Sequence, residues 1–214
     1  MPVTRILHRA RSPAELERLV RHPAVDAVAV DARVRDGCVL VHSGRPLGPL
    51  PVSIGLGGLR RIPSAASLAP VLAAVEGHAG LDVFLRSGSG DAAADLAREL
   101  MPSVDRVEVR VTCDAWEVAD RLREWLPGAE LAYAIRSEAQ LLWYLDARDR
   151  GLLRERPVMI DHRLLHTSDE VEVIHRRAGR VTAGTTQDID RAIELAEWGV
   201  DGVASDHVVV LNSL

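Results

Sequence analysis

The sequence predicts an α/β protein, a (β/α)8 TIM barrel formed by the whole chain of 214 residues. Short runs rich in Val, Ile, Leu and Ala alternate with longer segments whose apolar residues recur at helical spacing. Eight strand-like runs follow one another, and eight is the number that closes a parallel barrel. The length is ordinary for a single α/β barrel. An open, doubly wound sheet is the alternative that the same alternation allows.

The alternation runs from one end of the chain to the other. Five of the predicted helices start at a residue type that favours the N-cap, namely Ser12, Asp91, Asp114, Ser137 and Asp188. The predicted helices cover residues 12–22, 64–78, 91–101, 114–126, 137–151, 167–179 and 188–200. The predicted strands cover residues 4–9, 27–33, 81–86, 106–112, 129–136, 157–163, 180–185 and 202–206.

The interval between the second and third predicted strands, residues 34–80, breaks this alternation. Its apolar run "CVLVH" (38–42) predicts a strand extension or hairpin. The following stretch is rich in Gly and Pro and predicts an irregular loop insertion at about 43–66 in the single domain 1–214. Loops of this length in compact domains are usually functional or mobile. The "IGLGG" run lacks the third glycine of a dinucleotide fingerprint, so a plain loop is the better interpretation.

Composition excludes several classes of function. The net charge of −5 argues against a nucleic-acid partner. All 26 basic residues are arginine, so neither a lysine Schiff base nor a P-loop lysine is available. Two cysteines are too few for a disulfide framework or a zinc site. With no apolar run of signal-peptide or membrane-span length, a cytoplasmic protein is expected, and the composition resembles that of a high-GC bacterium. The oligomeric state is left open.

Polar residues gather at the predicted carboxyl ends of the strands, where the active sites of closed barrels lie. Histidines together with arginines and a carboxylate suit an anionic, phosphate-like ligand, because arginine binds the charge and histidine exchanges a proton near neutral pH. These strand-end residues are His8, Arg9, Asp31, Arg33, Arg86, Arg110, Thr112, Arg136, Asp161, His162, Arg163, Thr185 and Asp206, and the loop after the second strand adds His42.

Each of these residues also has a purely structural interpretation. His8 could be a hydrogen-bonded histidine inside the barrel, and Asp31 could cap a turn or pair with Arg33. His162 and His166 have the spacing of helical metal ligands but lie across a strand end. The "SGSGD" run (87–91) lies before a helix, where backbone amides bind phosphate, although a plain linker explains it as well.

Three stretches together resemble the glycerophosphodiester phosphodiesterase family. They are "ILHRA" at the first strand, "DAVAVDARVRDGCVLVHSG" at the second, and "AGRVTAGTTQDIDRAIELAEWGVDGVASDH" at the end of the chain. The resemblance covers nearly the whole chain in order. It implies a (β/α)8 barrel that hydrolyses phosphodiesters with two histidines as acid and base and with a divalent metal held by a Glu-x-Asp pair and a later acid.

Position by position, the resemblance assigns roles to four residues. His8 and His42 match the acid–base pair, Arg9 matches the phosphate-binding arginine, and Asp31 matches the second acid of Glu-x-Asp. Arg86 and Arg33 are expected to bind the substrate beside Arg9.

The sequence departs from the family at the metal ligands. Ala29 replaces the first acid, and "FLR" (84–86) replaces the acid-x-Lys pair of the third strand. Ser43 replaces the Asp after the second histidine, and Gly184 falls where the family has a tryptophan. One carboxylate holds Mg²⁺ or Ca²⁺ poorly. We therefore expect no metal, or a weakly held divalent ion at Asp31.

Two hypotheses of different class follow. The first is a divergent enzyme that uses His8 and His42 for acid–base chemistry on a small phosphate-bearing molecule, by phosphodiester cleavage, cyclisation or elimination. The second is a non-catalytic barrel that binds an anionic ligand or a partner protein. Turnover and metal content distinguish the two.

Overall fold

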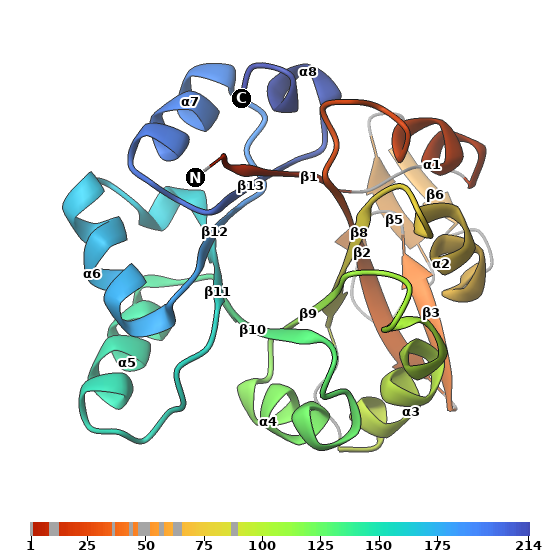
Figure 1. The fold of residues 1–214 in the computed structure, drawn as a ribbon, viewed down its shortest axis with the longest axis horizontal. Coiled ribbons are helices and arrows are strands. Elements are labelled where there is room, and N and C mark those ends of the chain that lie inside the picture. Colours follow the sequence, from red (N-terminus) through yellow and green to blue (C-terminus); the bar gives the residue numbers. More distant parts are fainter. Residues whose placement is uncertain are drawn as a thin grey trace.

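The computed structural model describes residues 2–8, 13–35, 37–42, 45–46, 52–55, 58–61, 66–86 and 90–214. Its centre is a closed barrel of parallel strands surrounded by helices (Figure 1). The barrel strands are β1 (Thr4–His8), β2 (Ala27–Arg35), β8 (Gly80–Leu85), β9 (Val109–Cys113), β10 (Glu130–Ile135), β11 (Val158–Asp161), β12 (Val181–Gly184) and β13 (Gly202–Ser205).

Strand β1 closes the barrel because it pairs in parallel with both β13 and β2. In the register, Ile6 lies opposite Ala204 on one side and opposite Ala27 on the other. Every other neighbouring pair in the ring is also parallel. The predicted (β/α)8 barrel is therefore confirmed, and the alternative of an open sheet is wrong.

Helices separate the strands and cover the outside of the ring (Figure 1). Short 3-10 helices, η1 (Met101–Ser103) and η2 (His162–Leu164), follow α3 and β11. The helices are α1 (Pro13–Leu19), α2 (Ala69–Val75), α3 (Gly90–Leu100), α4 (Trp116–Trp125), α5 (Glu138–Asp149), α6 (Ser168–Ala178), α7 (Ile189–Glu197) and α8 (Val208–Leu211).

Alternation along the strands separates two buried regions. In β2, Val28 and Val30 belong to the large apolar core that includes the helices. Ala29 instead belongs to a small cluster inside the barrel, because successive side chains of a strand point to opposite faces. The other buried members of this interior cluster are Ile6, Phe84, Met159 and Ala204.

The amino-terminal part of the interior is polar. Asp82 is 2% exposed and accepts a hydrogen bond from the hydroxyl of Thr112 at 3.0 Å. Arg110 lies 3.7 Å from Asp82 and pairs with Glu130. Burial raises the pKa of Asp82, and it outweighs the opposing effect of Arg110.

Arg110 and Thr112 were predicted to lie at a strand's carboxyl end, and this is wrong for Arg110, the second residue of β9; Thr112 lies next to the last residue of β9, but it is not among the residues that line the pocket. Strand β9 starts at Val109 and ends at Cys113, later than predicted, and Arg110 is opposite Glu130, the first residue of β10. Both side chains therefore belong to the polar layer inside the barrel.

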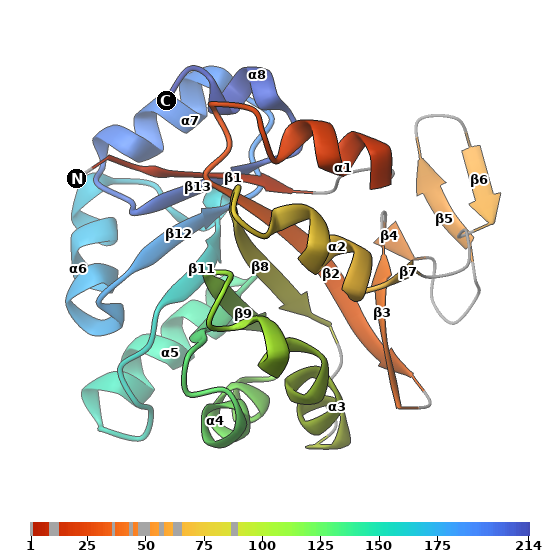
Figure 2. The ribbon, with the colours of Figure 1, turned by 45° about the vertical axis from the view of Figure 1, so that its right-hand side comes forward.

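The interval after β2 contains the predicted hairpin. Strand β3 (Cys38–His42) pairs antiparallel with the second half of β2, and β7 (Ala66–Ser67) pairs with β3. Figure 2 shows this hairpin extending past the barrel. Residues 43–44, 47–51, 56–57 and 62–65 lie outside the described part. The described remainder of the predicted loop, β4 (Arg45–Pro46), β5 (Val52–Gly55) and β6 (Gly58–Arg61), forms a separate antiparallel sheet.

The predicted N-caps have mixed outcomes. Ser137 accepts a hydrogen bond from the amide of Gln140, and Asp188 caps α7, so both are confirmed. Asp91 lies within α3, which begins at Gly90, and the N-cap of α4 is Ala115 and not Asp114. Ser12 lies outside the described residues.

In the described part of the chain, none of the helices is long and apolar enough to cross a membrane.

Candidate active site

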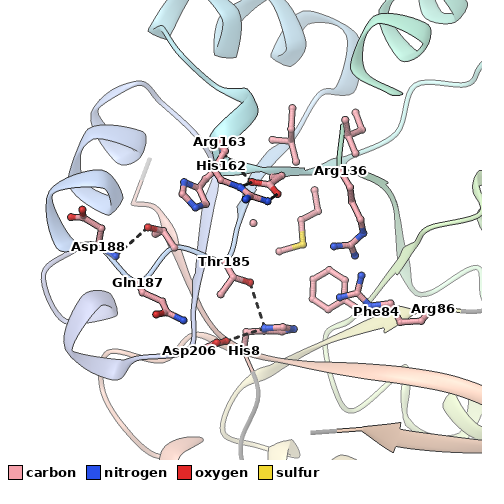
Figure 3. Close-up of a pocket in the computed structure, with 16 residues that line it drawn as sticks. His8, Phe84, Arg86, Arg136, His162, Arg163, Thr185, Gln187, Asp188 and Asp206 are labelled. Carbon is pink, nitrogen blue, oxygen red and sulfur yellow. Dashed lines mark hydrogen bonds and ion pairs between the residues drawn. The ribbon is translucent and has the colours of Figure 1, made fainter. Parts of the chain in front are cut away.

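A pocket of about 820 Å³ opens at the carboxyl ends of the strands. Figure 3 shows His8 and Asp206 at its base. Phe84, Arg86 and Arg136 lie on one wall, and we call this the arginine wall. The facing wall, which we call the polar wall, includes His162, Arg163, Thr185, Gln187 and Asp188.

His8 ends β1 and is 3% exposed. Its Nδ1 lies 3.1 Å from a carboxylate oxygen of Asp206 and 3.4 Å from the hydroxyl of Thr185, and both partners line the pocket. Its Nε2 is buried and lies 3.8 Å from Asp31. The centres of the His8 and Phe84 rings lie 5.4 Å apart in a T-shaped contact. The imidazole thus lies between two carboxylates, with Asp206 beside Nδ1 and Asp31 beside Nε2.

Asp31 is buried in β2 and forms an ion pair with Arg86, which follows β8. The guanidinium Nε and Nη2 of Arg86 both lie 2.6 Å from the same oxygen of Asp31. Burial alone would raise the pKa of Asp31, but the neighbouring His8 and the guanidinium of Arg86 together hold it well below its ordinary value. Asp31 is therefore a carboxylate across the physiological pH range.

A second carboxylate links the two arginines of the arginine wall. Asp114, after β9, accepts from Nε of Arg136 at 2.7 Å and from Nη1 of Arg86 at 3.4 Å. This contact explains why Asp114 does not cap α4, since its oxygens bind guanidinium groups instead. Arg86 also lies over the ring of Phe84, with 5.4 Å between its Cζ and the ring centre. The result is a row, Asp31–Arg86–Asp114–Arg136, around the pocket rim.

The positions of the missing family acids lie in the barrel interior. Ala29 is fully buried, and Phe84 is paired with Asp31 in the register of β2 and β8. Mg²⁺ and Ca²⁺ require several oxygen ligands. Among the residues that the structure describes, there is no group of three His, Cys, Asp or Glu side chains that could hold a metal ion. One oxygen of Asp31 already binds Arg86, so the described residues do not fit a divalent ion at this place.

The structure brings together three of the predicted site residues: His8, Asp31 and Arg86. Arg9 lies outside the described residues. The backbone of His42 is paired with that of Asp31 across the hairpin, while its side chain is not described. Arg33 lies further along β2 and is not among the residues that line the pocket. The roles of these residues remain predictions.

Asp206, Thr185, Asp114 and Arg136 complete the site. Three of them are strand-end residues in the sequence, but their partners are far away along the chain. Asp206, for example, is 198 residues from His8. Asp114 was assigned to a helix cap. The signal that could have selected them is the alternation of side chains along each strand. Once the strand is placed, this alternation predicts which residues at its end point into the barrel.

Solved structures with the same fold include several glycerophosphodiester phosphodiesterases. A phosphodiesterase from Oleispira antarctica, in complex with the product sn-glycerol-3-phosphate, has a TM-score of 0.76 at 15% identity over 98% of this chain and 96% of that one. The glycerophosphodiester phosphodiesterase from Thermotoga maritima has a TM-score of 0.69 at 16% identity over 97% and 96%. The enzyme from Parabacteroides distasonis has a TM-score of 0.70 at 13% identity over 98% and 95%.

No protein-family model and no curated protein matches the sequence. At such low identities the structural likeness establishes the fold. The predicted resemblance to the glycerophosphodiester phosphodiesterases is therefore confirmed for the architecture over nearly the whole chain.

Proposed function

We propose that this protein is a divergent glycerophosphodiester phosphodiesterase-like enzyme that uses histidine acid–base chemistry on a small phosphate-bearing substrate. The observation that carries the proposal is the placement of His8 between Asp31 and Asp206 at the base of the pocket. A phosphate-bearing substrate is consistent with the arginine wall and with the glycerol phosphate bound by the Oleispira antarctica protein.

In this proposal His8 exchanges a proton at Nδ1, the nitrogen on the side of the pocket-lining Asp206 and Thr185. The buried Asp31 contacts the other nitrogen and favours a charged ring, because a nearby carboxylate stabilises an imidazolium. The resemblance assigns the second proton transfer to His42. Cleavage, cyclisation and elimination all use such a pair of groups.

The positive charge beside Asp31 comes from Arg86 in this proposal and not from a divalent ion. The guanidinium lies against Asp31 and reaches the pocket. Arginine presents donors in a planar fork that matches phosphate oxygens. Arg9 and Arg33, predicted substrate-binding residues, would add to this charge. A reaction that requires no metal-activated water suits this arrangement.

The test is turnover of a panel of glycerophosphodiesters and bis(p-nitrophenyl) phosphate, with and without EDTA. We expect turnover that EDTA leaves unchanged and that His8→Ala lowers by roughly 10²- to 10⁴-fold, the usual contribution of a general acid or base. His166→Ala is the matched control, because His166 is exposed and does not line the pocket. Unchanged turnover in His8→Ala would contradict the mechanism, and stoichiometric Mg²⁺ or Ca²⁺ with EDTA-sensitive hydrolysis would support the conventional metal enzyme.

One observation favours the second candidate, a non-catalytic barrel that binds an anionic ligand. Arg86 and Arg136 are already paired with Asp31 and Asp114, which leaves less positive charge to stabilise the charge that develops in a reaction. This candidate predicts binding of inorganic phosphate or a phosphate ester without turnover of any diester. Calorimetric binding combined with the same panel distinguishes it from the enzyme.

A further inference from the structure

The outer face of α5 carries exposed apolar side chains, and Figure 1 shows this helix on the outside of the ring. Leu142 and Trp143 are adjacent in the middle of the helix and are 68% and 52% exposed. Tyr144 and Ala147, on the opposite face of the helix, are buried. Single exposed apolar residues are ordinary in folded proteins, whereas a contiguous apolar patch is typical of an interaction surface. We therefore ask what covers this face.

The indole of Trp143 is held in place from its inner side. Its ring centre lies 5.1 Å from that of Trp116, which is buried and donates from its indole nitrogen to the carbonyl oxygen of Ala134. A side chain that is already held in place loses little conformational entropy when a partner buries it. Aromatic residues are also frequent anchors at the centre of protein interfaces. Trp143 is therefore suited to the centre of a protein–protein contact.

Charged residues flank this apolar centre in an order that matches a second copy of the same helix. Glu138 is the first residue of α5 and Arg150 is its C-cap, and both are exposed. About three and a third helical turns separate them, so they lie on opposite flanks of the exposed stripe as well as at opposite ends. A two-fold axis through the middle of the stripe exchanges both the ends and the flanks. It therefore places Glu138 of one copy beside Arg150 of the other, and it does so twice.

Two acidic residues on the same face are neutralised within the chain. Asp146 pairs with Arg150 at 3.0 Å. Asp149 pairs with Arg177 of α6 at 2.8 Å. Because each acid has a guanidinium group beside it, the two copies of this face do not present a net negative charge to one another.

We propose that the outer face of α5 is a contact between two copies of this chain, packed as antiparallel helices about a two-fold axis. With the axis between Leu142 and Trp143, Leu142 of each copy packs on Trp143 of the other. One helix of this length covers less than the roughly 800 Å² per partner of a stable complex, so we expect a reversible dimer that is monomeric when dilute. Neither residue is among those that line the active-site pocket, so the dimer is independent of the proposed function.

The experiment is sedimentation velocity of the full chain over a wide range of protein concentrations, from low micromolar to near millimolar. We expect a concentration-dependent equilibrium between monomer and dimer. Leu142→Glu should weaken the dimer by roughly tenfold or more, because it places an unpaired charge at the apolar centre of the contact in both copies. Val209→Glu is the matched control, since Val209 is similarly exposed but lies on α8, on another side of the ring (Figure 1).

Charge reversal tests the antiparallel arrangement. Glu138→Arg and Arg150→Glu each replace two attractive contacts by two repulsive ones, and each should weaken the dimer several-fold. The double variant restores opposite charges across the contact and should recover most of the affinity. Arg150 also pairs with Asp146 within its own helix, so thermal unfolding of the dilute proteins identifies any variant that loses the fold.

Loss of the dimer in Leu142→Glu but not in Val209→Glu, with recovery in the double charge variant, supports the proposed contact. A protein that stays monomeric at every concentration overturns it, and so does a dimer that folded Leu142→Glu leaves unchanged. A dimer that the single charge variants weaken and the double variant fails to restore contradicts the antiparallel arrangement.

Discussion

The pKa of Asp31 depends on the side chains that surround its carboxylate. Burial disfavours its charge, yet His8 and Arg86 keep its pKa low. The pKa of Asp82, two positions before Phe84 on β8, is raised instead. Its contact with Arg110 is longer, at 3.7 Å, and burial dominates. The pKa values of two carboxylates inside the same barrel are thus shifted in opposite directions, because Asp31 has both His8 and a close guanidinium group beside it.

Asp82 gives a prediction for the dependence of stability on pH. Its folded-state pKa is raised, so the native state binds the proton more tightly than the unfolded chain does. This contribution is fully present below the unfolded pKa of about 3.9 and is lost as pH rises through the folded pKa. Denaturant unfolding should be measured over the pH range between the unfolded-state and folded-state pKa values of Asp82. The loss of stability with rising pH that Asp82 causes should be absent in Asp82→Asn. Asp105→Asn, at an exposed carboxyl, is the control and should leave the pH dependence unchanged. Parallel curves for Asp82→Asn and the unaltered protein would contradict the assignment.

Among the helices, the N-caps show when a local sequence signal prevails. Ser137 and Asp188 bind the first amides of their helices, as their residue types predict. Asp114 has a suitable side chain too, but Arg86 and Arg136 converge on it from the neighbouring strand ends. A tertiary ion pair therefore prevails over a local cap.

The cap of α5 can be tested by substitution. Ser137→Ala removes the oxygen that accepts from the amide of Gln140 at 3.3 Å. We expect a loss of about 1 kcal/mol in the free energy of unfolding, the usual value of an N-cap. Ser137→Asp keeps an acceptor and should cost much less. Equal losses in the two variants would show that the hydroxyl does not act as a cap.

For the whole molecule, the closed ring places most of the apolar core between the strands and the helices. Leu96 of α3 is fully buried in this layer, whereas Leu142 of α5 is 68% exposed. The small cluster inside the ring lies beneath the pocket and supports His8 through Phe84. Stability and the site thus depend on different sets of apolar side chains.

This division predicts the effect of two leucine substitutions. Leu96→Ala should lower the free energy of unfolding by about 2–5 kcal/mol, through lost transfer free energy and the cavity that remains. Leu142→Ala should have an effect within about 0.5 kcal/mol, as is usual for surface substitutions. Chemical denaturation measures both values. A small effect of Leu96→Ala would mean that the layer beneath α3 can collapse into the cavity.

Much of the fold could be predicted because strand and helix periodicity are local. The eight barrel strands and the hairpin of β2 with β3 follow from runs of apolar residues. The ends of these runs were less certain, as β9 shows. The strand was predicted at 106–112 but runs from Val109 to Cys113, so Arg110 lies near its start and not at its carboxyl end. A shift along a strand changes which layer a side chain joins, so site assignments are sensitive to it.

The sequence by itself determined the order of the elements, the absence of lysine chemistry, and the candidacy of His8, Asp31 and Arg86. It could do so because periodicity and residue type are properties of short segments. Only the tertiary structure decided that Asp206 and Thr185 contact His8, that Asp114 joins two arginines, and that Arg86 lies against Asp31 beside Phe84. These contacts join segments that are distant along the chain, and closure of the ring through β1, β2 and β13 brings them to one rim.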